Sequence, residues 1–184
     1  MKKIIVIDDD QDILALVKHS LSRDFEVAFA DTVSAGERLI AQGDYDLVIL
    51  DENLPDGFGT ELLQRVKSTD GKEDIPIVML TPFSREVSLK IEKLDLGSID
   101  YIFSWLGNAD ILLAIIKLIE DRVNVDNDVE EVGVQTIILV EDNIRFYSSY
   151  LPIMYKIIFK QSESFVNEGL NEHQRMMRMR GRPK

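Results

Sequence analysis

Two apolar runs that each end in aspartate decide the fold of this chain: Lys3-Ile4-Ile5-Val6-Ile7-Asp8-Asp9 and Asp46-Leu47-Val48-Ile49-Leu50-Asp51. Each run continues without a polar break, which is typical of a parallel strand that is buried on both faces. Apolar residues at helical spacing follow each of them. Strands that alternate with helices in this way imply right-handed crossovers and a mainly parallel sheet.

The first 123 residues alternate five expected strands with five expected helices. The strands are expected at 3–7, 26–30, 46–50, 75–80 and 100–103. The helices are expected at 13–21, 34–41, 62–66, 87–94 and 110–123, with Thr32 or Ser34 near the start of the second and Asn108 opening the fifth. The fold class predicted is α/β, a doubly wound five-stranded parallel sheet, with the loop Leu54-Pro55-Asp56-Gly57 after the third strand.

Composition excludes several classes of protein. The chain has 184 residues, is 45% apolar and has no apolar run long enough to cross a bilayer. The apolar run near the N-terminus is too short for an export signal, so we expect a cytoplasmic protein. There is no cysteine, which excludes disulfides and thiolate zinc sites, and His19 and His173 are isolated. A net charge of −12 argues against nucleic-acid binding by the main body.

The C-terminal part of the chain has a different pattern. Residues 124–135 are acidic and aperiodic, which predicts a linker. Ile137-Ile138-Leu139-Val140-Glu141-Asp142 then repeats the pattern of Ile4–Asp9. Either any buried strand that ends in acids looks like this, or a second copy of the same domain begins here. The second alternative is favoured, because a long apolar helix follows, with Pro152 expected to kink or restart it.

The apolar face of this helix carries Tyr147, Leu151, Met154 and Ile158, and it must pack against another protein surface to be shielded from solvent. The first domain or another copy of the chain could provide it, so a homodimer through residues 143–180 is one possibility. The basic end Arg178–Lys184 resembles the Gly-Arg-Pro core of an AT-hook. Basic residues also suit a helix C-terminus, and this second interpretation is favoured, so no nucleic-acid partner is expected.

Three carboxylates follow the first and third strands: Asp8, Asp9 and Asp51. In a doubly wound sheet these strand ends lie side by side at the edge where ligands bind. Clustered carboxylates are costly unless a cation or a shifted pKa relieves them, and Mg²⁺ is the natural cation for oxygen ligands. A carboxylate can also act as a nucleophile and form an aspartyl phosphate.

Residues 1–123 resemble the receiver domains of two-component response regulators, which are CheY-like phosphorelay proteins. The resemblance rests on motifs in a specific order and spacing: Asp8-Asp9, Asp51, Leu54-Pro55-Asp56-Gly57-Phe58-Gly59, Thr81, and Gly97-Ser98-Ile99-Asp100-Tyr101. It implies a flavodoxin-like fold and a signalling role, with no enzymatic activity beyond the domain's own phosphorylation and dephosphorylation.

By this resemblance, Asp51 would be the phosphoacceptor. Asp8, Asp9 and Asp51 would hold Mg²⁺ together with the backbone carbonyl of Asn53. The donor would be a sensor histidine kinase, a phosphotransfer protein or a small acyl phosphate. The phosphorylated state would pass to a downstream effector domain through a face made by the fourth helix, fifth strand and fifth helix.

The resemblance also assigns a switch, and here the chain departs from the family. Thr81 would be the switch hydroxyl and Tyr101 the switch aromatic, although a strand-closing and a core role are the alternatives. Ser104-Trp105 stands where the family usually has lysine and proline. Pro82 has no N–H with which to contact a phosphoryl group.

These departures leave two functions open. The first is a receiver that binds Mg²⁺ and accepts a phosphoryl group on Asp51. The alternative is a pseudo-receiver, a phosphorylation-independent interaction or dimerisation module, which Ser104 and Pro82 favour. A DNA-binding regulator would need an effector domain that the sequence does not reveal. The domain organisation expected is a receiver at 1–123, an acidic linker at 124–135, and the first strand and helix of a truncated second receiver-like domain at 136–184.

Overall fold

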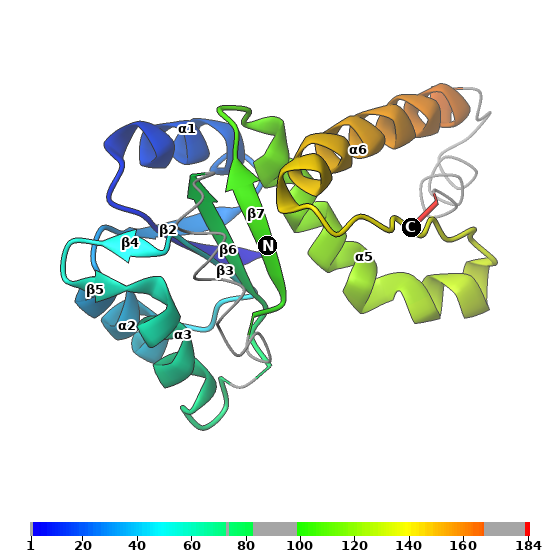
Figure 1. Ribbon diagram of the computed structural model, residues 1–184. Coiled ribbons are helices and arrows are strands. Elements are labelled where there is room, and N and C mark those ends of the chain that lie inside the picture. Colours follow the sequence, from blue (N-terminus) through cyan, green and yellow to red (C-terminus); the bar gives the residue numbers. More distant parts are fainter. Residues whose placement is uncertain (1, 73, 83–98, 168–182) are drawn as a thin grey trace. The chain divides into compact units, whose positions relative to one another are not determined.

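The computed structural model describes residues 2–72, 74–82, 99–167 and 183–184 (Figure 1). The chain forms two compact units, Met1–Leu112 and Leu113–Lys184, so the division falls inside a helix. None of the helices within the described residues combines the length and hydrophobicity that a transmembrane span requires.

A parallel sheet of five strands forms the first unit, in the order β2-β1-β3-β6-β7. The strands are β1 (Lys3–Ile7), β2 (Glu26–Ala30), β3 (Leu47–Leu50), β6 (Ile77–Pro82) and β7 (Tyr101–Trp105). The predicted five-stranded parallel sheet is therefore confirmed. The strand order reverses between β1 and β3, and the carboxyl ends of these two strands carry the predicted acidic pocket.

Helices cover both faces of this sheet (Figure 1). They are α1 (Gln11–Leu21), α2 (Val33–Gln42) and α3 (Gly59–Lys67), and α1 lies on the opposite face from α2 and α3. One core cluster joins β1, β3 and β6 to α2 and α3. Its members Ile5, Ile7, Leu50 and Leu62 are almost fully buried. The helix expected over 87–94 lies outside the described residues.

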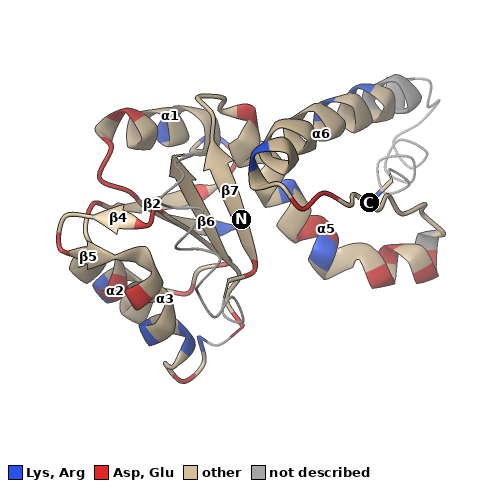
Figure 2. Ribbon diagram, in the orientation of Figure 1, with Lys and Arg blue, Asp and Glu red and all other residues tan. Residues whose placement is uncertain are grey.

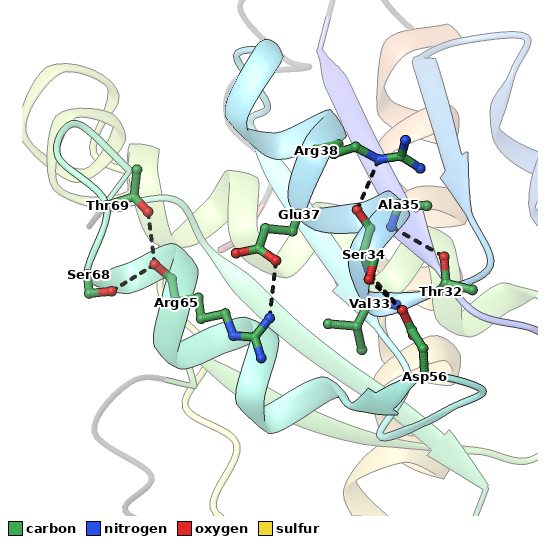
Figure 3. Close-up of polar contacts among 10 residues, drawn as sticks. All are labelled: Thr32, Val33, Ser34, Ala35, Glu37, Arg38, Asp56, Arg65, Ser68 and Thr69. Atoms are coloured by element: carbon green, nitrogen blue, oxygen red, sulfur yellow. Dashed lines mark hydrogen bonds and ion pairs between the residues drawn. The ribbon is translucent and has the colours of Figure 1, made fainter.

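The predicted loop after β3 contains a two-residue hairpin, β4 (Asn53–Leu54) paired with β5 (Gly57–Phe58). Asp56 lies at its tip and caps α2 (Figure 3). Its carboxylate accepts bonds from the N–H of Val33 at 2.7 Å, the N–H of Ser34 at 3.0 Å and the hydroxyl of Ser34 at 2.7 Å. Thr32 adds the predicted side-chain cap, because its Oγ1 accepts from the N–H of Ala35 at 3.2 Å. The hairpin is thus anchored to a neighbouring helix.

Two long helices dominate the second unit, α5 (Asp110–Val132), whose first turn belongs to the first unit, and α6 (Ile144–Asn167). The predicted linker over 124–135 is wrong for residues 124–132, because α5 continues through them. Figure 2 shows the acidic residues along this C-terminal part of α5. Gly133 ends the helix with a φ of 70°, and the N–H groups of Gly133 and Val134 bond to the carbonyls of Val129 and Asp128. This pattern is a glycine C-cap.

The strand predicted at 137–140 does not form within the described residues. Ile138 and Val140 are 85% and 88% exposed, whereas the matching residues of β1, Ile5 and Ile7, are fully buried. A strand needs neighbouring strands on which to place its hydrogen bonds and side chains. The long helix predicted after it is confirmed as α6, which continues through Pro152.

Candidate functional site

The acidic cluster predicted from the sequence is present at the carboxyl ends of β1 and β3. One carboxylate oxygen from each of Asp8, Asp9 and Asp51 lies within 4.8 Å of the others. Asp8 and Asp51 are buried and Asp9 is exposed. The N–H of Asp51 donates to the carbonyl of Ile7 at 2.9 Å, which ties the two strand ends together. Three carboxylates thus converge on one point with a side open to solvent.

Asp51 is held by one of its two carboxylate oxygens. Its Oδ2 accepts a bond from the N–H of Asn53 at 3.3 Å. Its Oδ1 is buried and has no hydrogen-bond partner among the described residues. A buried carboxylate oxygen without a partner is costly, and a cation or a bound group would satisfy it. The donor set of three carboxylates, all oxygen, fits Mg²⁺.

Burial changes the protonation of this cluster. It raises the pKa of Asp8 from 3.8 to about 7, and repulsion from Asp51 adds to the rise while the N–H of Asp10 opposes it. Burial also raises the pKa of Asp51. The Thr81 hydroxyl is near enough to oppose that rise in the pKa, although it does not reach hydrogen-bond geometry with Asp51. The cluster therefore attracts either a proton or a cation.

The predicted switch residues lie on the neighbouring strands β6 and β7. Thr81 and Ser104 are register partners, and their side chains are 3% and 2% exposed. Pro82 pairs in the same way with Trp105, at the last position of both strands. Tyr101 lies at the start of β7, is half-buried, and pairs with Val78. The structure thus brings Thr81 and Ser104 together and places Tyr101 apart from both.

Two residues to which the sequence analysis assigned no individual role support the loop that starts at Asp51. Glu52 is 3% exposed, and its carboxylate accepts from the N–H of Thr60 at 3.1 Å and from the Thr60 hydroxyl at 3.4 Å. Gly59, the first residue of α3, lies so close to Asp51 that an added Cβ would collide with the Asp51 carbonyl oxygen. Only glycine fits there. The short glycine-rich run Gly57-Phe58-Gly59 was the available signal.

Comparison with known proteins decides what this architecture is. The model of the response regulator receiver domain family matches residues 4–116. The chain belongs to this family. Its receiver domain has relatives among bacterial regulators. The transcriptional regulatory protein SpaR of Bacillus subtilis is 37% identical over 108 residues, which cover 58% of this chain and 47% of SpaR. CusR of Escherichia coli is 32% identical over 119 residues, which cover 65% of this chain and 51% of CusR.

Solved receiver structures agree with the fold. The response regulator TrrA of Thermotoga maritima, in complex with Mg²⁺ and BeF, is 30% identical with a TM-score of 0.56, covering 65% of this chain and 99% of TrrA. A CheY-like receiver domain of Methanospirillum hungatei is 28% identical with a TM-score of 0.57, covering 67% and 98%. The chain spans about half the length of the curated relatives CusR and SpaR. The receiver domain thus has a signalling role, and the comparisons give the pseudo-receiver alternative no support.

Proposed function

We propose that this receiver domain binds Mg²⁺ and accepts a phosphoryl group on Asp51. The observation that carries the proposal is the buried Asp51 Oδ1, which lacks a hydrogen-bond partner among the described residues, beside the carboxylates of Asp8 and Asp9. Asp8, Asp9 and Asp51 would hold the ion with the backbone carbonyl of Asn53. When bound, Mg²⁺ would neutralise charge on the transferring phosphoryl group.

Asp51 acts as the nucleophile in this proposal. One of its two carboxylate oxygens attacks phosphorus. A bond forms between this oxygen and phosphorus, and the bond to the donor breaks, which leaves the imidazole of a phosphohistidine or the carboxylate of an acyl phosphate. Hydrolysis of the aspartyl phosphate by water returns the Asp51 carboxylate and releases inorganic phosphate. The chain would catalyse only these reactions on itself.

Thr81, Tyr101 and Ser104 form the switch of the proposal. The Thr81 hydroxyl is buried without a hydrogen bond among the described residues, so it is available to a phosphoryl oxygen on Asp51. Its partner in register, Ser104, supplies a neutral hydroxyl where the family usually has a cation. Tyr101 would follow Thr81 by a change of rotamer. We expect a sensor kinase or phosphotransfer protein to donate the phosphoryl group in the cytoplasm. An effector domain would then respond to the phosphorylated state.

The domain organisation belongs to the same proposal, and hydrogen bonds repeated in the two units support it. The N–H of Asp10 donates to the Asp8 carboxylate at 2.8 Å, and Asp10 caps α1. The N–H of Asn143 donates to the Glu141 carboxylate at 3.0 Å, and Asn143 caps α6. The second unit therefore starts its helix as the receiver domain does.

A second repeated contact involves Lys184. Its N–H bonds to the carbonyl of Gln135 at 3.1 Å, as the N–H of Glu26 at the start of β2 bonds to the carbonyl of Lys2 at 3.1 Å. The N–H of Ile137 donates in turn to the carbonyl of Lys184 at 2.6 Å, which gives the alternation of a parallel pair. These contacts support residues 136–184 as the opening of a second receiver-like domain.

The test of the proposed function is intact-mass spectrometry after incubation with acetyl phosphate, with Mg²⁺ or with EDTA. The parent should gain one phosphate only with Mg²⁺, and Asp51→Asn should gain none. Beryllofluoride, which needs no phosphodonor, should change the fluorescence of Trp105, the only tryptophan. An adduct of equal size on Asp51→Asn would contradict the assignment of Asp51. A chain that responds to neither reagent would favour the pseudo-receiver.

A further inference from the structure

Helix α6 has two apolar faces, and one of them is buried. Leu151 and Tyr155 are 4% and 7% exposed, Pro152 is buried as well, and the Tyr155 hydroxyl donates to Oδ2 of the buried Asp121 at 3.0 Å. Lys184 adds an ion pair to the same aspartate at 3.4 Å. This face therefore already has its partners.

The opposite face of α6 carries an exposed apolar stripe, formed by Phe146, Tyr150, Ile153 and Ile157. These side chains are 49%, 45%, 57% and 53% exposed, and the rings of Phe146 and Tyr150 stack at 6.1 Å. At about 100° per residue, the stripe lies roughly 180° from the covered face. Its steps of four, three and four residues are those of an a/d seam between paired helices. A continuous apolar stripe of this kind marks an interaction surface.

We propose that this α6 stripe pairs with the α6 stripe of a second copy of the chain, with the two helices antiparallel. The spacing is symmetric about the midpoint between Leu151 and Pro152. A two-fold axis at that point places Phe146 opposite Ile157 of the other copy and Tyr150 opposite Ile153. The stripe is thus complementary to itself in this orientation, as a closed two-fold interface requires.

Charge favours the same orientation. Glu141 and Asp142 precede the first turn of α6, and Lys160 lies one turn beyond Ile157. Antiparallel pairing brings Lys160 of each copy to the acidic pair of the other, whereas parallel pairing would bring like charges together. Such charges at the rim of an interface set its orientation more than its affinity.

If the second unit begins a second receiver-like domain, the expected sheet of that domain accounts for only half of the stripe. Phe146 and Tyr150 match Ile13 and Val17 of α1, which are buried in the first unit, but Ile153 and Ile157 match the polar residues Ser20 and Asp24. A sheet belonging to a second receiver-like domain would therefore cover two of the four side chains. A second copy of α6 covers all four, which is why it is the occupant proposed.

Introduced cysteines test the pairing sharply, since the natural chain has none. Phe146→Cys and Ile157→Cys, mixed and oxidised, should form disulfide-linked dimers that contain one of each variant. Either variant alone should stay monomeric on a non-reducing gel, because eleven residues of helix separate like positions by about 16 Å and a disulfide spans about 7 Å at most between Cα atoms. Self-linked Phe146→Cys would indicate parallel helices and overturn the orientation.

Sedimentation of the full chain over two decades of concentration tests the interface itself, without a phosphodonor. The parent should dimerise, Tyr150→Glu should be monomeric, and Lys156→Glu, on the same helix but outside the stripe, should dimerise like the parent. Circular dichroism checks that each variant keeps its helices. A parent that is monomeric throughout, as expected if a second receiver-like sheet were the intended cover, would overturn the proposal. A Tyr150→Glu variant that still dimerises would overturn it too.

Discussion

Thr81 and Ser104 are register partners at the ends of β6 and β7, and both side chains are buried. A neutral hydroxyl therefore lies beside Thr81, at the edge of the sheet that carries the acidic cluster. The family's usual lysine would bring a positive charge to this edge. Its replacement should slow phosphorylation without removing the acceptor.

Ser104→Lys should accelerate phosphorylation of Asp51 by acetyl phosphate. A charge-assisted hydrogen bond to a phosphoryl oxygen contributes about 1.5–3 kcal/mol, which corresponds to a rate increase of about tenfold or more. The initial rate of adduct formation, followed by intact mass, measures it. Ser104→Met is the control, with a long uncharged side chain, and should give no acceleration. Equal rates for the two variants would show that the missing charge is unimportant.

Asp8→Asn should remove a pH dependence of folding stability. Burial raises the pKa of Asp8 from 3.8 to about 7, so the folded state holds a proton that the unfolded chain has lost. This stabilisation is complete below about pH 4 and is lost as the pH rises through about 7. In EDTA, the melting temperature of the parent should fall more steeply between pH 5 and pH 8 than that of Asp8→Asn. Parallel curves from calorimetry would contradict the raised pKa.

Gly59→Ala should destabilise the domain and impair the acceptor. The added Cβ collides with the carbonyl oxygen of Asp51, and backbone cannot give way as a side chain can. Such overpacking costs about 1–3 kcal/mol, which urea denaturation measures. Gly57→Ala is the matched control, because its nearest neighbour is Oε2 of Glu61 at 3.2 Å, the end of a flexible side chain. Equal stability of the two variants would disprove the close approach.

Asp56→Ala should loosen the β4–β5 hairpin from α2. It removes three hydrogen bonds to Val33 and Ser34, which also hold the pKa of Asp56 below its usual range. The stabilisation is present above about pH 4 and is lost as the pH falls further. The melting temperature of the variant should therefore be lower than that of the parent at pH 7, with the difference shrinking in acid. Asp70→Ala, at another exposed aspartate, should melt like the parent.

The receiver core could be predicted because its signals are local. The strands Lys3–Ile7 and Glu26–Ala30 begin and end at the predicted residues. Short apolar runs between polar or acidic residues leave little choice of where a strand starts and stops. The convergence of Asp8, Asp9 and Asp51 follows from the positions of strand ends in a doubly wound sheet.

The rest depends on contacts that a sequence pattern does not record. Glu52 and Asp56 each bond to a helix start outside their own strand or hairpin, at Thr60 and at Ser34. The end of α5 was missed although Gly133 marks it, because acidic residues without periodicity resemble a linker and also suit an exposed helix. The strand predicted at 137–140 has the composition of β1, but within the described residues no strand pairs with it as β2 and β3 pair with β1.

The central claim is that Asp51 carries the phosphoryl group, and borohydride trapping tests it most directly. Reduction converts an aspartyl phosphate into homoserine, which peptide mass spectrometry locates in the chain. After incubation with acetyl phosphate and Mg²⁺, the account predicts homoserine at position 51 and its loss in EDTA. Homoserine at another aspartate, or an unmodified position 51 in a chain that has gained phosphate, would contradict the account.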